Sequence, residues 1–178
     1  MPKVIWQWDG PFLGKVRKKV LNRDFMQTQI SANADHLVQP IENWFEYPVR
    51  VQVHHTDCSG VVWHGTYITW LEEARVECLR SIGVNYADWV ATGYELPVVE
   101  LTIRYHRPLK MGASVVVRTR MLGMKGVRIH WDYQIQSLDG QELYVTAQVT
   151  LVVIESQSGK IVRRLPVAIL EALTKLSD

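Results

Sequence analysis

Apolar residues recur every three or four positions near the middle of the chain, which is the period of one face of an α-helix. The residues of this stripe are Tyr67, Leu71, Ala74, Cys78 and Ile82. Gly83 follows the stripe, and glycine often ends a helix because it adopts the left-handed conformation without steric cost. The pattern therefore predicts a helix of about five turns with one buried face.

Apolar and polar residues alternate with a period of two on both sides of this helix, which is typical of half-buried β-strands. The alternating runs cover residues 49–53, 99–105, 114–121, 127–135 and 143–153. The residues 123–126 are expected to form one turn between strands, and Asp139-Gly140 is a strong signal for another. Two further helices are expected, one capped by Asn85 and one that begins at Pro166.

The order of these elements is one strand, a long helix and then four strands. This order indicates an α+β protein rather than an alternating βαβ protein. We therefore expect an antiparallel sheet that covers the apolar face of a single helix.

A polar turn of residues 56–60 separates the first strand from the helix, and Asp57 lies in it, seven residues before His64. The first N–H groups of a helix have no intrahelical partner and carry partial positive charge. A carbonyl oxygen placed against them would be polarised, and negative charge developing on it would be stabilised. Asp57 could act there as a nucleophile or a general base. It could equally cap the turn, as aspartate often does.

The run of residues 56–75 resembles the signature of the hotdog-fold acyl-CoA thioesterases. It is most similar to the group of 4-hydroxybenzoyl-CoA thioesterases and Tol-Pal-cluster acyl-CoA thioesterases. The resemblance extends from about Trp44 to Pro166 and implies an antiparallel sheet wrapped around a long central helix. The matching positions in the signature are Asp57, Gly60, Val62, His64, Tyr67, Glu72, Ala74 and Arg75.

The resemblance also implies a mechanism, the hydrolysis of an acyl-CoA to free acid and CoA. Asp57 would attack the thioester or activate water, and the helix start at His64 would hold the carbonyl oxygen through its backbone N–H. Lys125 resembles a residue in a turn that contacts CoA. The residues expected to contact the substrate are Gly60, Trp63, Gly65, Tyr67 and Lys125.

The sequence does not identify the acyl group, because it combines features of both branches of the family. His64 is similar to the Tol-Pal-cluster branch and Trp63 to the 4-hydroxybenzoyl branch, whereas Val53 stands where the former branch has a tyrosine. Three tryptophans, Trp63, Trp70 and Trp89, would suit an aromatic acyl group if they line a pocket, but they could equally belong to the core.

Three functional alternatives also stay open. The acyl carrier could be an acyl carrier protein rather than CoA, the protein could bind acyl-CoA without cleaving it, or Glu73 could be the base. No cofactor is expected. A metal site from His54, His55, His64 and Asp57 is not expected either, because adjacent strand residues such as His54 and His55 point to opposite faces.

Composition agrees with one compact domain that has no nucleic-acid partner. A chain of 178 residues with 47% hydrophobic residues can bury a sizeable core without disulfides, and a formal charge of +2 produces no strong field. Cys58 and Cys78 form no disulfide framework or metal spacing, which favours the cytoplasm. No apolar run is as long as a membrane-spanning helix.

The resemblance also implies an oligomer. Because hotdog active sites are built across a dimer interface, a homodimer or homotetramer is expected.

The family core normally begins near Trp44, so we expect residues 44–178 to form the hotdog domain and residues 1–43 an N-terminal extension of unknown role. The extension contains aromatic residues and a basic run at 15–19. It could pack as an arm on the core or on a neighbouring subunit, or it could dock an anionic partner.

Overall fold

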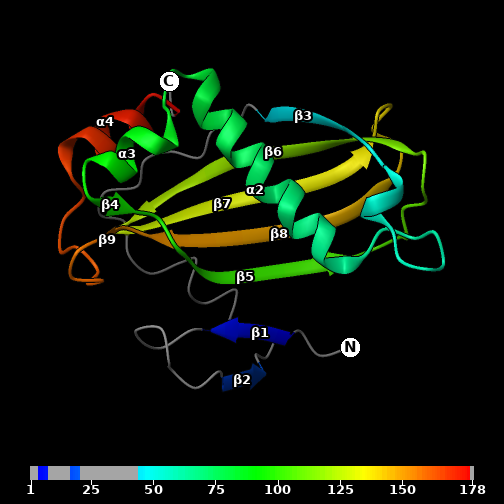
Figure 1. Cartoon of the computed structure of the whole chain (residues 1–178), viewed down its shortest axis with the longest axis horizontal. Coiled ribbons are helices and arrows are strands. Elements are labelled where there is room, and N and C mark those ends of the chain that lie inside the picture. Colours follow the sequence, from blue (N-terminus) through cyan, green and yellow to red (C-terminus); the bar gives the residue numbers. More distant parts are fainter. Residues whose placement is uncertain (1–3, 8–16, 21–43, 177–178) are drawn as a thin grey trace.

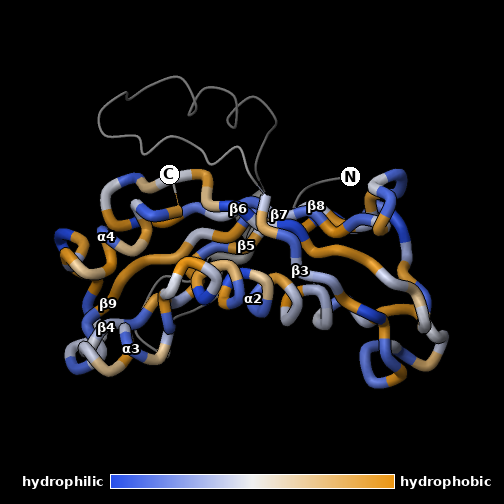
Figure 2. The backbone as a smooth tube through the Cα atoms, turned by 90° about the horizontal axis from the view of Figure 1, so that it is seen from above, coloured by the Kyte–Doolittle hydropathy of each residue, from blue (hydrophilic) through white to orange (hydrophobic). Residues whose placement is uncertain are grey.

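A long helix, α2 (His64–Ser81), lies across one face of an antiparallel sheet that curves around it (Figures 1 and 2). The structure is a computed structural model and describes residues 4–7, 17–20 and 44–176. Seven strands form the sheet in the order β2-β1-β5-β8-β7-β6-β3. They are β1 (Val4–Gln7), β2 (Arg17–Val20), β3 (Phe45–Arg50), β5 (Val98–Tyr105), β6 (Ser114–Lys125), β7 (Arg128–Ser137) and β8 (Leu143–Val152). This architecture confirms the predicted α+β hotdog fold.

Smaller elements gather at the end of the sheet where α2 finishes (Figure 1). They are the helices α3 (Tyr86–Ala91) and α4 (Val167–Thr174) and a two-stranded sheet of β4 (Tyr94–Glu95) and β9 (Ile154–Glu155). Both helices were expected from their start signals. The side chain of Asn85 accepts a hydrogen bond from the Ala87 N–H at the start of α3. Among the described residues, no helix is both long and apolar enough to cross a membrane.

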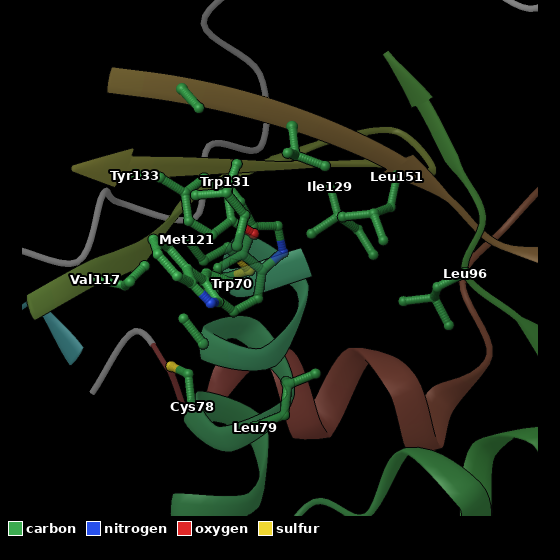
Figure 3. Packing of buried hydrophobic residues seen from close by; sticks show 14 of the residues in the cluster. Trp70, Cys78, Leu79, Leu96, Val117, Met121, Ile129, Trp131, Tyr133 and Leu151 are labelled. Carbon is green, nitrogen blue, oxygen red and sulfur yellow. The ribbon is translucent and has the colours of Figure 1, made fainter. Parts of the chain in front are cut away.

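The core lies between α2 and the sheet (Figure 3). Of the predicted stripe, Tyr67, Leu71, Ala74 and Cys78 are buried, and Ile82 is partly buried. Trp70, which lies beside the stripe, is only 1% exposed and packs in the same cluster as Trp131 and Met121. Each large apolar side chain buried in this way contributes about 1.5–3 kcal/mol to stability.

The first strand differs from the prediction. It ends at Arg50, and the chain continues into a 3₁₀ turn, Val53–His55, in which Val53 is 73% exposed. The last apolar position that faces the core is Val51, whose N–H donates to the Ala113 carbonyl at 2.8 Å. The expectation that Val53 lies in a half-buried strand was therefore wrong.

The predicted turn at residues 123–126 was also wrong in its position. Strand β6 continues to Lys125, with a register shift between Met121 and Gly123 where the ladder with β7 is interrupted. A bulge of this kind absorbs one extra residue without ending the strand. The turn itself lies at residues 126 and 127, where Gly126 has a φ of 61°.

The N-terminal segment contributes a hairpin to the edge of the sheet. Strand β1 pairs with β2 and, through residues 6 and 7, with residues 101 and 100 of β5. Part of this segment lies outside the described residues, namely the aromatic residues Trp8 and Phe12 and positions 15 and 16 of the basic run.

We expect removal of residues 1–42 to leave a folded core. Strand β5 pairs with β8 from Val98 to Tyr105, whereas β1 adds only two residue pairs at its other edge. Urea unfolding followed by circular dichroism should therefore keep a single cooperative transition. A truncated protein without a cooperative transition would instead show that the extension is part of the core.

Candidate active site

A tight turn of residues 57–61 lies immediately before α2. The N–H of Asp57 donates to the carbonyl of Val61 at 2.8 Å, and the N–H of Gly60 donates to the carbonyl of Asp57 at 3.0 Å. A bridge between Thr56 and Val62 closes the base of the turn. Gly60 has a φ of 71°, a conformation that side chains disfavour, so the turn itself requires a glycine.

Two backbone hydrogen bonds anchor this turn to the segment that follows β5. The N–H of Val62 donates to the carbonyl of Leu109 at 2.9 Å, and the N–H of Met111 donates to the carbonyl of Gly60 at 3.1 Å. The position of the turn is therefore fixed by this segment between β5 and β6 and does not depend on its own hydrogen bonds alone.

The two carboxylate oxygens of Asp57 have different environments. Oδ1 accepts hydrogen bonds from the N–H groups of Ser59, at 2.8 Å, and Val61, at 3.3 Å. Oδ2 accepts no hydrogen bond from the described part of the chain, and the side chain is exposed. The capping and the catalytic interpretations are therefore compatible, because one oxygen holds the turn while the other is available to react.

The first two amides of α2 point out of the helix and have no partner in the part of the chain that the structure describes. The N–H of Trp63 donates to the carbonyl of His55 at 3.0 Å, and the N–H of Thr66 donates to the carbonyl of Trp63 at 2.9 Å. Between them, the N–H groups of His64 and Gly65 donate to no described residue. These two donors and the helix dipole provide a site for a polarised carbonyl oxygen.

Trp63 folds back over the first turn of α2. A Cβ atom at position 65 would lie 2.0 Å from its ring, so Gly65 is needed for this close approach rather than for an unusual backbone angle. The ring also lies 4.7 Å from that of His64 and is 52% exposed. Trp70 and Trp89, in contrast, are buried in the core. Of the three tryptophans considered from the sequence, only Trp63 is exposed at the helix start.

An open pocket of about 320 Å³ adjoins the helix start. Its walls include two tyrosine rings, Tyr67 and Tyr105, whose centroids are 5.4 Å apart. Burial raises the pKa of both phenols, so both hydroxyl groups are protonated at neutral pH. The complete lining is Val61, Val62, His64, Tyr67, Tyr105, His106, Arg107 and Pro108.

Sequence analysis missed Tyr105 as a site residue. It is the last residue of β5, and its hydroxyl donates to the carbonyl of His64 at 3.1 Å. The alternation of apolar residues identified its strand and face, but nothing local shows that this strand ends beside α2.

Lys125 lies away from the other expected site residues. It ends β6 and pairs with Arg128, whereas the opposite end of β6 pairs with the end of β3 that leads into the turn at Asp57. At a rise of about 3.3 Å per residue, the length of β6 separates Lys125 from that end by more than about 30 Å. The structure thus brings together Asp57, Gly60, Trp63, His64, Gly65 and Tyr67, and not Lys125.

The alternative chemistries find less support in the geometry. The expectation that His54 and His55 point to opposite faces of a strand was wrong. Both residues lie in the 3₁₀ turn, and their ring centroids are 4.1 Å apart. The Nδ1 of His55 accepts a hydrogen bond from the Gln52 N–H, and burial together with His54 lowers the pKa of His55. Within the described ranges, no group of three His, Cys, Asp or Glu side chains is placed to hold a metal ion.

Other nucleophiles and bases are placed less well than Asp57. Burial raises the pKa of the Cys78 thiol to about 11, so it is protonated at neutral pH. Glu73 lies nine residues into α2, about 13 Å along the helix axis from its start, and accepts a hydrogen bond from the Tyr47 hydroxyl at 3.4 Å. Glu73 is therefore remote from the unpaired amides.

The sheet wrapped around α2 is a hotdog fold, and the relatives and structural neighbours of the chain show that it is a thioester hydrolase. Comparison with known families agrees with this class. The Thioesterase-like superfamily matches residues 51–173, and the chain belongs to this family.

Named relatives cover most of the same region. A candidate esterase of Synechocystis, sll0410, is 56% identical over 135 residues, which is 76% of this chain and 81% of that protein. A candidate acyl-CoA thioesterase of Bacillus subtilis, YneP, is 30% identical over 63% of this chain and 80% of its own length. The chloroplastic acyl-acyl carrier protein thioesterase ATL2 of Arabidopsis thaliana is 32% identical over 66% of this chain and 62% of its own length.

Solved structures show the same fold. A 1,4-dihydroxy-2-naphthoyl-CoA thioesterase from Synechocystis superimposes with a TM-score of 0.69 at 25% identity, over 76% of this chain and 99% of that chain. The DHNA-CoA thioesterase of Staphylococcus aureus superimposes with a TM-score of 0.68 at 29% identity, over 74% of this chain and 89% of its own.

Proposed function

We propose that the protein hydrolyses acyl-CoA thioesters to free acid and CoA in the pocket beside the start of α2. The observation that carries this proposal is the pair of amides at His64 and Gly65, which donate to no described residue, next to the turn that holds Asp57. The family of thioester hydrolases to which the chain belongs supports it.

In this mechanism the thioester carbonyl oxygen accepts hydrogen bonds from the backbone N–H groups at the helix start. Charge that develops on this oxygen is stabilised by donors that are already oriented. The Oδ2 of Asp57 either attacks the carbonyl carbon, giving an acyl-enzyme that water hydrolyses, or takes a proton from an attacking water. In both routes the C–S bond breaks, CoA leaves as a thiol after protonation, and the acid is released.

The pocket favours an aromatic acyl group. Aromatic side chains of Trp63, Tyr67 and Tyr105 surround the helix start, and flat rings stack favourably on such surfaces. The naphthoyl-CoA thioesterases among the structural neighbours support this choice.

A panel of aromatic, short-chain and long-chain acyl-CoAs, assayed for released thiol, tests the proposal. We expect the aromatic thioesters to have the highest kcat/KM. The second candidate, hydrolysis of acyl-acyl carrier protein, is favoured by the similarity to the Arabidopsis enzyme. Cleavage of acyl carrier protein thioesters with none of the acyl-CoA panel would establish that function instead, and tight binding without any cleavage would establish a non-catalytic binding protein.

We also propose that the functional unit is at least a homodimer. Lys125 lies at the far end of β6, so it can reach a CoA bound at the site only if a second copy supplies it. Antiparallel pairing of β5 with its own copy would achieve this, because Tyr105 lies at the site end of β5 and Val98 at the Lys125 end. Because β1 pairs with residues 100 and 101 of this edge in the protomer, the second copy would replace it there.

The remaining proposals concern the setting of the protein. We place the hotdog domain at residues 44–178 and treat residues 1–43 as an extension that the family does not require. We propose the reducing cytoplasm as the compartment, because Cys58 and Cys78 are both free thiols.

Lys125→Ala should raise KM for acyl-CoA more than it lowers kcat. A phosphate contact remote from the thioester stabilises ground state and transition state alike, so its loss appears in KM. Steady-state kinetics at low salt measure this, because screening weakens exposed charge contacts as salt rises. Lys175→Ala, which removes an exposed positive charge from the end of α4, should leave KM unchanged. An unchanged KM in the Lys125 variant would remove Lys125 from the CoA site.

Mixing two variants, one without activity and one with a raised KM, tests whether Lys125 acts across the dimer. Subunits carrying Asp57→Asn and subunits carrying Lys125→Ala should together form a mixed dimer with one complete site. Activity at substrate concentrations well below the wild-type KM should then exceed the sum of the separate variants. A mixture that is no more active than that sum would show that Lys125 does not act from the second copy.

A further inference from the structure

We infer that Tyr105 is a positioning residue for the oxyanion site, an inference that rests on the proposed function. Its hydroxyl donates to the backbone carbonyl of His64 at 3.1 Å, and His64 is the first residue of α2. This contact joins the end of β5 to the peptide group whose N–H belongs to Gly65. The hydroxyl therefore acts on a catalytic donor through the backbone and without touching the reacting atoms.

The planarity of the peptide bond makes this contact directional. The carbonyl of His64 and the N–H of Gly65 share one trans peptide plane and point in opposite directions. A hydrogen bond that holds the carbonyl oxygen therefore holds the N–H as well, and aims it out of the helix start. Tyr105 would add to the restraint on this peptide when the carbonyl of a substrate approaches.

The neighbouring donor is oriented by the helix alone. The N–H of His64 shares its peptide plane with the carbonyl of Trp63, which accepts the N–H of Thr66 at 2.9 Å. The carbonyl of His64 is also an intrahelical acceptor, because His64 is the first residue of α2 and the N–H of Ile68 lies four residues on. The helix thus orients both oxyanion donors, and the hydroxyl of Tyr105 adds a second hydrogen bond, from the sheet, to one of them. Glycine at position 65 has no side chain that could restrict this peptide, so the contact with Tyr105 adds to the restraint that the helix provides.

The hydroxyl of Tyr105 can also strengthen the donor. A carbonyl that accepts a hydrogen bond polarises its peptide group, which makes the attached N–H a better donor, by roughly 10–30% in energy. Because burial raises the pKa of Tyr105 above its ordinary value of 10.0, the phenol keeps its proton at neutral pH. The ring itself has a separate role, since it packs 5.4 Å from the ring of Tyr67 as a wall of the pocket.

The test uses the full-length protein with Tyr105→Phe, which keeps the ring and removes only the hydroxyl. Complete loss of an oxyanion donor costs about 10²–10³ in kcat. Here the donor remains but is less well aimed, so we expect kcat to fall about tenfold with KM changed less than about twofold. Tyr144→Phe is the matched control, because its exposed hydroxyl donates to Glu142 and not to α2. This control should keep the wild-type kcat.

A second measurement separates positioning from a merely structural role. The ¹⁵N–¹H resonance of Gly65 should shift in the Tyr105→Phe protein, while the urea unfolding midpoint stays within experimental error of wild type. The control should leave the Gly65 resonance in place.

Three results would overturn the inference. They are a kcat within twofold of wild type, a loss confined to KM, and an unmoved Gly65 resonance. Each is distinguishable from failure of the proposed function, because they leave the activity of the wild-type protein and its dependence on Asp57 intact. Conversely, a protein that hydrolyses no thioester would refute the proposed function and this inference together.

Discussion

Asp57→Asn should lose nearly all hydrolysis while the protein stays folded and oligomeric and still binds acyl-CoA. The asparagine oxygen can replace Oδ1 as acceptor for the N–H groups of Ser59 and Val61, so the turn is preserved. The substitution removes the charge and basicity that attack on the thioester, or on water, requires. Loss of a nucleophile or general base typically lowers the rate by about two to four orders of magnitude. The measurement is kcat on the best acyl-CoA, with binding of the same thioester measured by calorimetry.

Two variants serve as controls for this result. Asp139 has a similar turn role, since its Oδ1 accepts the N–H of Gln141 in the hairpin between β7 and β8, so Asp139→Asn should keep full activity. His64→Ala should lose less activity than Asp57→Asn, because the proposed oxyanion contact is a backbone N–H that survives the substitution. If Asp57→Asn instead turned over at close to the wild-type rate, the assignment of the site would be wrong and Glu73 would be the next base to test.

The part of the site that sequence analysis predicted is the part that is contiguous in the chain. Asp57, Gly60 and His64 lie within one turn and the helix start that follows it, so local hydrogen bonding and local backbone conformation determine their arrangement. The apolar stripe of α2 and the alternation in β5 to β8 are equally local signals. They were sufficient to predict a sheet packed on one helix, because packing the apolar face of the helix against that of the sheet buries both.

The features that sequence analysis missed depend on contacts between distant segments. Tyr105 reaches His64 only because β5 ends beside α2, 41 residues later in the chain. Lys125 is remote from the site because β6 runs the length of the sheet, which the residues of the β6–β7 turn do not reveal. The end of β3 at Arg50 is likewise set by the partner strand, since the alternation of apolar residues continues to Val53.

An ion pair on α2 joins a buried arginine to a half-exposed glutamate, and its spacing in the sequence does not reveal these surroundings. Arg75 and Glu72 pair at a separation of three residues, as expected on one helix face. Arg75 is nevertheless only 3% exposed, and its guanidinium also donates to the hydroxyl of the buried Tyr133 at 3.1 Å. Burial would lower the pKa of Arg75, but Tyr133 and Glu72 raise it above its ordinary value, so the side chain stays charged in the core.

Removal of Glu72 should therefore destabilise the protein more than removal of the arginine. Glu72→Ala leaves the Arg75 charge buried with one neutral partner, and loss of one member of a buried pair typically costs about 3–5 kcal/mol. The Glu72 side chain is 52% exposed, so solvent reduces the expected loss to about 2–3 kcal/mol in the free energy of unfolding. Arg75→Met removes the charge and keeps the packing volume, so its cost should be within about 1 kcal/mol.

Urea titrations of the single variants and of the double variant, all at one protein concentration, measure these differences. The double variant should be as stable as Arg75→Met alone, because Glu72 has no buried charge to compensate once the arginine is gone. The exposed pair Glu77–Arg80 on the same helix provides a matched control with the same spacing. Glu77→Ala should cost no more than about 0.5 kcal/mol, since exposed pairs contribute little. An Arg75→Met protein less stable than Glu72→Ala would show that the hydrogen bond to Tyr133, and not compensation of the buried charge, is the main contribution of this pair.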